Sequence, residues 1–265
     1  MPYMQLPDAR LYVEEHGDGL PILLIHGTGS DADNWGSAID DFALLGRVIS
    51  YDRRGFGRSA WPDRPPRTTP VPHAHDAAAL LDALDADPAI VIGRSYGGNV
   101  AIELALRYPG RVRALALLEG GGEALSPEVR TFIDELLARI RAAVAEGGPE
   151  AAGETLMRGV LGDDGYEALP DERKDRTRAN GASILAELEG FYDVQPGLEQ
   201  LRRIACPVLV VSATTSPPAF QKCNETLVAA LRNARLVTVG GGHVITPADQ
   251  EVVDFIREVL PHVKT

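Results

Sequence analysis

A serine between closely spaced glycines stands where a buried strand is expected to meet a helix. The pattern Gly-x-Ser-x-Gly occupies residues 93–97, directly after the apolar run Ala89–Ile92 and at the start of a helical segment, Tyr96–Tyr108. A turn this tight requires small flanking residues and holds the serine in a strained backbone conformation above the end of the strand. Ser95 is therefore the candidate nucleophile.

A histidine near the carboxyl end of the chain is the candidate general base. A serine hydroxyl is a weak nucleophile until a neighbouring base can take its proton. His243 lies in a glycine-rich loop between the last expected strand and the last helix, which is the position of the base in enzymes with this serine turn. His26 is interpreted as a structural residue that holds its loop, and His73 and His75 are left open between site and solvent.

Two backbone amides are candidates for an oxyanion hole, which needs N–H groups aimed at the negative charge that develops on the substrate. One belongs to Tyr96, the residue after the candidate nucleophile. The other belongs to the loop after His26, where Thr28 is best placed. Gly29 in the same loop is a candidate substrate contact, because glycine lets the main chain approach a ligand closely.

Four motifs together resemble those of the α/β-hydrolase superfamily, and the resemblance covers almost the whole chain. They are His26-Gly27, the Asp-Arg-Arg-Gly-Phe-Gly-Arg-Ser stretch at 52–59, the serine turn at 93–98 and Gly242-His243. The resemblance implies a doubly wound, mostly parallel, eight-stranded α/β sheet. It also implies that Asp52 anchors a turn and takes no part in catalysis. It says little about the substrate, because this fold hosts many reactions.

The acid of a Ser-His-acid triad is missing from its usual place. The superfamily usually carries an Asp a few residues after the strand that corresponds to Pro207–Val211. Here Thr215 or Ser216 stands at that point, and the next carboxylate is Glu225. The base still needs a group that fixes its tautomer and stabilises the imidazolium.

Glu119 is the expected replacement for the missing acid. It ends the strand Val112–Leu118, and some members of the superfamily, including one haloalkane dehalogenase subgroup, carry the acid at the end of that strand. The carboxylate would then lie beside Ser95 and within reach of His243. Glu123 is the second candidate, and a Ser-His dyad with a water in place of the acid is the third.

Short apolar runs alternate with helix-length segments, as in a doubly wound α/β fold. Runs without polar alternation are typical of parallel strands that are covered on both faces, and a hairpin over Met4–Glu15 is expected at the sheet edge. The six expected parallel strands are Pro21–Ile25, Arg47–Tyr51, Ala89–Ile92, Val112–Leu118, Pro207–Val211 and Ala234–Val239.

One long helical segment interrupts this alternation. Residues 123–202 contain no good strand and are too long for a crossover, so they are predicted to form a helical cap over the carboxyl edge of the sheet. The α/β core would then comprise residues 1–122 and 203–265. The helices expected outside the regular alternation are Pro127–Ala145, Ala151–Leu161, Asp171–Glu189 and a C-terminal helix over Pro247–Leu260.

Two further residues are candidate substrate contacts. Arg94, inside the serine turn, would either bind a substrate carboxylate or pair structurally with Glu119 or Asp52, because a buried arginine needs a partner. Trp35 follows the oxyanion loop, where the superfamily carries an aromatic residue, and that likeness favours a place in the core.

The composition of the chain limits the classes of molecule that it is expected to bind. The 265 residues are 45% hydrophobic and 24% charged, with a net charge of −12, which disfavours nucleic acid and anionic lipid. No signal peptide and no bilayer-length apolar stretch is found, so a cytoplasmic location is expected. Neither the two cysteines nor the histidines have metal-site spacing. A small-molecule substrate is expected without a cofactor or metal; the oligomeric state is open, with a homodimer as one alternative.

The function predicted from these residues is hydrolysis of a carboxylic ester, thioester or lactone through an acyl-enzyme on Ser95. A carbon–carbon bond hydrolase is an alternative, because it uses the same residues. A ligand-binding protein that has kept the fold and lost turnover is a second alternative, and the missing acid is its best support. Dehalogenase and epoxide hydrolase chemistry is disfavoured, because those relatives carry Asp where Ser95 stands.

Overall fold

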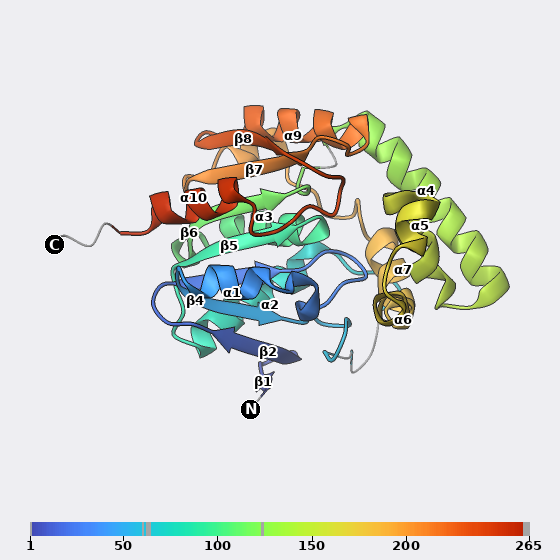
Figure 1. Ribbon diagram of the computed structural model, residues 1–265, viewed down its shortest axis with the longest axis horizontal. Coiled ribbons are helices and arrows are strands. Elements are labelled where there is room, and N and C mark those ends of the chain that lie inside the picture. Colours follow the sequence, from blue (N-terminus) through green and yellow to red (C-terminus); the bar gives the residue numbers. More distant parts are fainter. Residues whose placement is uncertain (1, 60, 62–64, 123–124, 262–265) are drawn as a thin grey trace.

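A single mixed sheet forms the centre of the molecule (Figure 1). The computed structural model describes residues 2–59, 61, 65–122 and 125–261, and within them eight strands pair in the order β1-β2-β4-β3-β5-β6-β7-β8. The strands are β1 (Tyr3–Gln5), β2 (Arg10–His16), β3 (Pro21–Ile25), β4 (Arg47–Tyr51), β5 (Ala89–Arg94), β6 (Val112–Leu118), β7 (Val208–Ala213) and β8 (Ala234–Val239).

The predicted sheet is confirmed in its strands and in their directions. Strands β3 to β8 run parallel to one another, and β1 and β2 form the expected antiparallel hairpin at one edge. All six residues of β5 and of β7 are buried, as expected for strands that are covered on both faces. Parallel strands end at one edge of a sheet, so the residues that follow β3, β5, β6 and β8 are brought near one another there.

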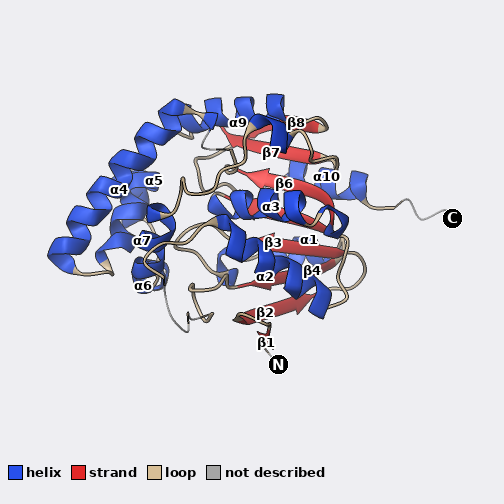
Figure 2. Cartoon of the chain, turned by 180° about the vertical axis from the view of Figure 1, so that it is seen from behind, coloured by secondary structure: helices blue, strands red, loops and turns tan. Residues whose placement is uncertain are grey.

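Helices cover both faces of the sheet. One face carries α1 (Ala38–Ala43) and α10 (Gln250–Val259), and the other carries α2 (Pro70–Ala83), α3 (Tyr96–Arg107) and α9 (Pro218–Ala230) (Figures 1 and 2). The short elements are η1 (Ala32–Trp35), η2 (Pro109–Arg111) and α8 (Leu198–Leu201).

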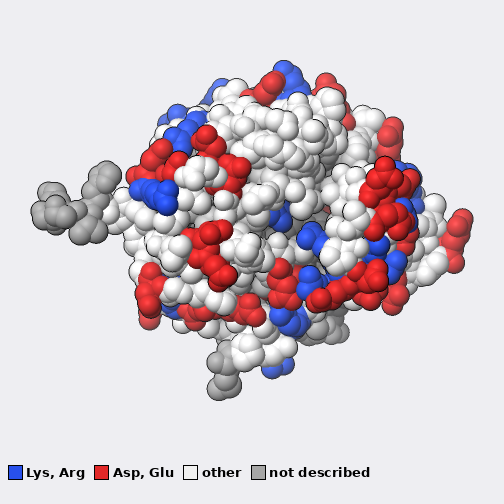
Figure 3. Space-filling view, viewed as in Figure 1, with Lys and Arg blue, Asp and Glu red and all other residues white. Residues whose placement is uncertain are grey.

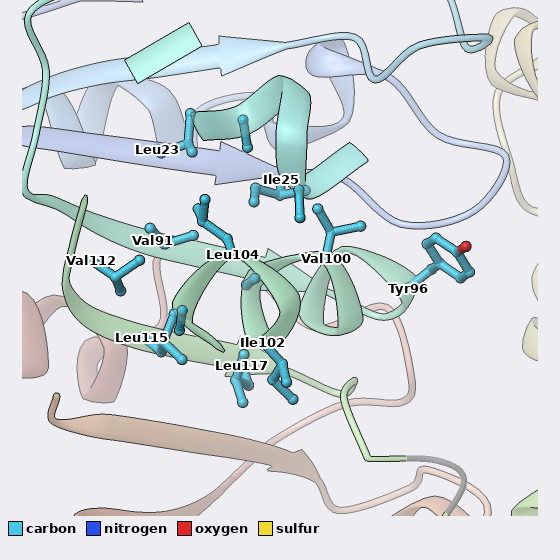
Figure 4. Packing of buried hydrophobic residues seen from close by; sticks show 14 of the residues in the cluster. Leu23, Ile25, Val91, Tyr96, Val100, Ile102, Leu104, Val112, Leu115 and Leu117 are labelled. Atoms are coloured by element: carbon cyan, nitrogen blue, oxygen red, sulfur yellow. The ribbon is translucent and has the colours of Figure 1, made fainter. Parts of the chain in front are cut away.

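Helix α3 packs most closely on the centre of the sheet. In Figure 4 its Leu104 lies beside Val91 of β5 and its Val100 beside Ile25 of β3, and all four side chains are inaccessible to solvent. This packing fixes the amino end of α3 at the carboxyl end of β5. Ser95 stands at that junction.

Four helices between β6 and β7 lie beyond the carboxyl ends of the strands, and we call them the cap (Figure 1). They are α4 (Pro127–Gly147), α5 (Ala151–Glu167), α6 (Asp171–Ala179) and α7 (Gly181–Glu189). Buried apolar residues of α4, α5 and α7 belong to the same hydrophobic cluster as α3 and β5. The cap therefore packs continuously with the core, while the division at residues 123 and 202 stays a prediction.

Three helix predictions were wrong in detail. The helix expected over Ala151–Leu161 continues to Glu167, past a kink at Gly162. The helix expected over Asp171–Glu189 is two helices, which meet at Asn180, and the side chain of Asn180 instead holds the core through Gly29 O and Gly57 N. The C-terminal helix starts at Gln250, because Asp249 caps it by accepting a hydrogen bond from the Glu251 amide. In the described part of the chain, no helix is both long enough and apolar enough to cross a membrane.

Candidate active site

Ser95 occupies a turn that leaves no room for larger neighbours. Its φ is 49° and its ψ is −126°, a left-handed conformation that L residues rarely adopt. A Cβ on Gly93 would lie 2.4 Å from Gly97 O, and one on Gly97 would lie 2.1 Å from Ile25 O. Both glycines are therefore required by contact with the main chain, and the strained turn presents the Ser95 hydroxyl at the end of β5.

Ser95, His243 and Glu119 form a hydrogen-bonded line. His243 Nε2 lies 3.1 Å from Ser95 Oγ, and His243 Nδ1 lies 3.3 Å from Glu119 Oε2. His243 and Glu119 are buried, with 8% and 1% of their surface exposed. The spacing is that of a nucleophile, a base and a group that orients the base. Glu123, the second candidate acid, lies outside the described residues.

Glu119 is held by donors from β7 and the elements that follow it. Its Oε1 accepts hydrogen bonds from the Ala213 amide at 2.6 Å and from Asn224 Nδ2 at 3.2 Å, and its Oε2 accepts one from the Ser216 hydroxyl. Sequence reasoning missed the roles of Ser216 and Asn224. Only Ser216 carried a signal, because it stands where the superfamily usually has its acid.

The same donors decide the charge of Glu119. Burial raises the pKa of this carboxyl, but hydrogen bonds from His243, Ser216 and the Ala213 amide outweigh burial, and the net pKa lies below its ordinary value. Glu119 is therefore ionised at neutral pH. An ionised acid fixes the His243 tautomer with its proton on Nδ1 and leaves Nε2 free to take the proton of Ser95.

The loop after His26, the candidate oxyanion loop, is shaped by a fully buried arginine. Arg53 Nε donates to His26 O at 2.9 Å, and Arg53 Nη2 donates to Gly27 O at 3.1 Å. The C=O and N–H of a trans peptide point in opposite directions, so the Thr28 N–H points away from Arg53. A Cβ on Gly27 would lie 3.1 Å from Ser95 Cβ, so this loop passes directly beside Ser95.

His26, His73 and His75 can now be placed, and His26 has the structural surroundings that the sequence suggested. His26 Nε2 accepts the Arg53 amide at 2.9 Å, which leaves the ring proton on Nδ1, 2.8 Å from Gly27 O. Burial, and then the charge of Arg53, hold the His26 pKa well below its ordinary value. His73 is buried beneath the site, 3.4 Å from Glu187 Oε1, and His75 is exposed. His26 and His73 are therefore neutral structural groups.

A cavity of about 90 Å³ lies over Ser95, between the sheet edge and the cap. Ser95, His243, Thr28 and Tyr96 line its floor. Its walls are mostly apolar and come from the cap, from residues such as Ile133, Leu136, Met157, Val160 and Leu188. Sequence reasoning missed these residues, because the helical pattern shows that they are buried but not whether they face a core or a cavity.

The fold and this site can be compared with known proteins. A family model described as "Alpha/beta hydrolase family" matches residues 22–255. The chain belongs to the α/β-hydrolase family. Among the described residues of this hydrolase, no group of three or more His, Cys, Asp or Glu side chains is arranged to hold a metal ion.

Similar proteins are hydrolases of several kinds. The chain is 42% identical to the "Putative carbamate hydrolase RutD" of Azorhizobium caulinodans over 95% of each chain. A malate-bound esterase of Thermogutta terrifontis is 26% identical with a TM-score of 0.78, and covers 100% of this chain and 98% of its own. Est816, described as an N-acyl homoserine lactone degrading enzyme, is 25% identical with a TM-score of 0.72, over 98% of this chain and 100% of its own.

Three candidate substrate contacts of this α/β-hydrolase lie in different surroundings. Arg94 lines the cavity and donates to Ile245 O at 3.0 Å; among the described residues it forms no ion pair with Glu119 or Asp52. Trp35 is buried in the core on the α1 face, beneath the Arg94 guanidinium, and is outside the described cavity lining. Gly29 is outside that lining too, because it packs against the cap.

We expect Ser216→Ala to lower kcat of the hydrolase about tenfold, because a hydrogen bond to a charged group contributes roughly 1.5–3 kcal/mol. The hydroxyl binds the carboxylate oxygen that faces His243, and Ser216 is outside the described lining of the cavity, so KM should stay constant. Steady-state kinetics with a short-chain ester measure both constants. Ser216→Thr keeps a hydroxyl and should restore kcat; an Ala variant with wild-type kcat would contradict this positioning role.

Proposed function

We propose that this α/β-hydrolase cleaves a carboxylic ester, thioester or lactone of small size through an acyl-enzyme on Ser95. One observation carries the proposal: the unbroken line from Ser95 Oγ through His243 to the ionised Glu119. The small, mostly apolar cavity over Ser95 supports a compact acyl group.

The geometry supports acylation of Ser95 as the first step. Ser95 Oγ attacks the carbonyl carbon while His243 Nε2 takes its proton, and Glu119 stabilises the imidazolium that forms. The amides of Thr28 and Tyr96 would bind the oxyanion, since the N–H groups of a helix's first turn point out of its amino end. His243 then returns the proton to the leaving alcohol, thiol or hydroxyl as the tetrahedral intermediate collapses.

Deacylation uses the same groups with water as the nucleophile. His243 takes a proton from the water as it attacks the acyl carbonyl, and the collapse of the second intermediate returns that proton to Ser95. The products are the free acid and the regenerated enzyme. Every proton step in this scheme uses His243, so its distance of 3.1 Å from Ser95 Oγ is the dimension on which the proposal depends.

A fluorophosphonate probe tests the proposal directly. We expect it to label wild-type protein at Ser95, with no labelling of Ser95→Ala, and p-nitrophenyl acetate to give a burst of p-nitrophenol that matches the enzyme concentration. Peptide mass mapping locates the label. If folded protein takes no label at Ser95, the result would contradict the hydrolase mechanism. It would favour a ligand-binding protein that retains the fold.

A carbamate is the second candidate substrate, because a putative carbamate hydrolase is 42% identical over 95% of this chain. Attack of Ser95 on the carbonyl of a carbamate ester would expel the alcohol, which takes its proton from His243; water would then hydrolyse the carbamoyl-enzyme to a carbamic acid, which decomposes to CO₂ and ammonia or an amine. Carbamates and esters with a common leaving alcohol, compared by kcat/KM, separate the two candidates. A higher kcat/KM for the carbamate would replace the ester proposal, whereas a carbon–carbon bond hydrolase would prefer a diketone to both.

A further inference from the structure

Two arginines line the cavity over Ser95 without a carboxylate partner among the described residues. Arg94 immediately precedes the nucleophile and is 7% exposed, and Arg173 reaches the cavity from α6 of the cap, where it is half-buried. Figure 3 shows the face of the molecule that is seen in Figure 1. Basic side chains lie at the centre of this face, beside a hollow whose surface is otherwise almost free of charged side chains. A buried cation is costly unless an anion accompanies it.

Arg94 has contacts that orient it but leave its charge uncompensated. Its Nη2 donates to Ile245 O at 3.0 Å, and its guanidinium lies 5.1 Å from the centre of the Trp35 ring. Its Nε is buried and has no hydrogen-bond partner. Burial, and then the nearby charge of Arg173, lower the pKa of Arg94 to about 10, which leaves the group protonated at neutral pH. The neutral carbonyl and the aromatic face hold the side chain in place for another ligand.

Arg173 differs from its neighbours on α6. Arg176 pairs with Asp31 at 3.3 Å and with Asp33 at 3.1 Å, and Arg178 pairs with Glu154 at 3.3 Å, whereas no ion pair is formed by Arg173 within the described residues. Its Nε, too, is buried without a hydrogen-bond partner. Within the described part of the chain, Asp31 is the acidic group that acts electrostatically on Arg173, and Asp31 is already paired with Arg176 at 3.3 Å. The guanidinium of Arg173 therefore brings to the cavity a positive charge that has no ion-pair partner of its own among the described residues.

We propose that Arg94 and Arg173 form an anion subsite, and that the hydrolase acts on a small substrate that carries a carboxylate besides its scissile carbonyl. This inference rests on the proposed function, because it places the subsite in the cavity of the nucleophile. The planar fork of a guanidinium matches a carboxylate, and one arginine from the core and one from the cap can approach it from two sides. The apolar walls of the cavity limit the size of the substrate, and the two arginines fix its orientation.

Matched substrates test the subsite. In methyl hydrogen succinate the acyl group carries a carboxylate, and methyl 4-methylpentanoate replaces it by a neutral group of the same shape. Acetoxyacetate and isobutyl acetate form the corresponding pair with the group on the alcohol. We expect wild-type kcat/KM, measured by pH-stat titration, to favour the anionic member of at least one pair about ten- to a hundredfold.

Two variants then locate the preference. Arg94→Met and Arg173→Met should each lower the ratio of kcat/KM for the anionic ester to kcat/KM for its neutral partner about tenfold or more, mainly by raising KM for the anionic ester. Arg178→Met is the matched control on α6, because its side chain already pairs with Glu154 and Asp175, and it should keep the preference. If Arg94→Met fails to fold, Arg173→Met alone still decides. Neutral esters preferred in both pairs, or a preference that survives these substitutions, would overturn the subsite.

A binding measurement separates this inference from the proposed function. Calorimetry of the Ser95→Ala protein with succinate requires no turnover, and we expect binding that weakens about tenfold with Arg94→Met or Arg173→Met. If the fluorophosphonate leaves Ser95 unlabelled but succinate binds through both arginines, the proposed function fails and the subsite stands. If Ser95 is labelled and succinate does not bind, the subsite fails and the hydrolase stands.

Discussion

Replacing Glu119 by Gln is expected to lower kcat about 10⁴-fold, the loss typical of a triad whose acid becomes an amide. The Gln carbonyl can still accept from the Ala213 amide and Asn224, so its NH₂ group takes the Oε2 position. That NH₂ faces His243 Nδ1 and reverses the tautomer, which puts a proton on Nε2, where it can no longer accept one from Ser95. Steady-state kinetics of purified, folded variant measure the effect.

Glu103→Gln is the matched control, because Glu103 is also a buried glutamate, 2.7 Å from its partner Arg107 and remote from the cavity. It should keep wild-type kcat. A Glu119→Gln variant whose kcat is within tenfold of wild type would transfer the role of the acid to Glu123 or to a water.

The folded-state pKa of Glu119 is lowered, so the ionised form stabilises the fold above pH ~4.5, and this stability is lost as pH falls through the folded pKa. The difference in unfolding free energy between wild type and Glu119→Gln should shrink accordingly.

The second large effect is expected at the buried ion pair between core and cap. Arg53 Nη1 and Glu187 Oε1 pair with both side chains fully buried, and Glu187 belongs to α7. Arg53→Met leaves the Glu187 carboxylate without its partner, which typically costs about 3–5 kcal/mol. Urea unfolding at pH 7 measures this loss. We also expect kcat to fall, because Arg53 holds the carbonyls of His26 and Gly27 in the oxyanion loop.

An exposed pair on the same cap helix provides the control. Arg141 binds Glu189 of α7 through two hydrogen bonds of 2.6 Å, but the Arg141 side chain is 56% exposed, so Arg141→Met should cost less than about 1 kcal/mol. The double variant Arg53→Met/Glu187→Met removes both buried charges and should regain part of the stability. A loss below about 1 kcal/mol for Arg53→Met alone would contradict the structural role of the pair.

Strands that are buried on both faces could be predicted from the sequence, whereas the packing of the cap could not. Continuous apolar runs such as Ala89–Ile92 have one physical solution in a parallel sheet, and their positions agree with the structure. The break at Asn180 carried only the weak signal of the Asn180-Gly181 pair, and the hydrogen bond that holds Asn180 there goes to Gly29 O, more than a hundred residues away. Contacts between distant segments override local helical pattern at this point.

The candidate site shows the same limit. Ser95, Glu119 and His243 could be proposed as neighbours because each follows a strand that ends at one edge of the sheet. Asn224 could not, because it reaches Glu119 from the middle of α9, and a buried asparagine on a helix has no distinctive pattern. Arg173 could not be distinguished from Arg176 and Arg178 by sequence, since all three belong to one highly charged helix. They differ in whether the side chain lines the cavity, as that of Arg173 does.

The contact between Ser216 and Glu119 joins the carboxyl ends of two neighbouring strands. These two residues stand at the ends of adjacent strands, where the superfamily carries its acid in one place or the other, and here they share a hydrogen bond at the oxygen that faces His243. Either strand end therefore offers a carboxylate a path to the same imidazole nitrogen. The position of one imidazole nitrogen therefore fixes where a carboxylate oxygen must lie, but not which of the two strand ends has to carry the carboxylate.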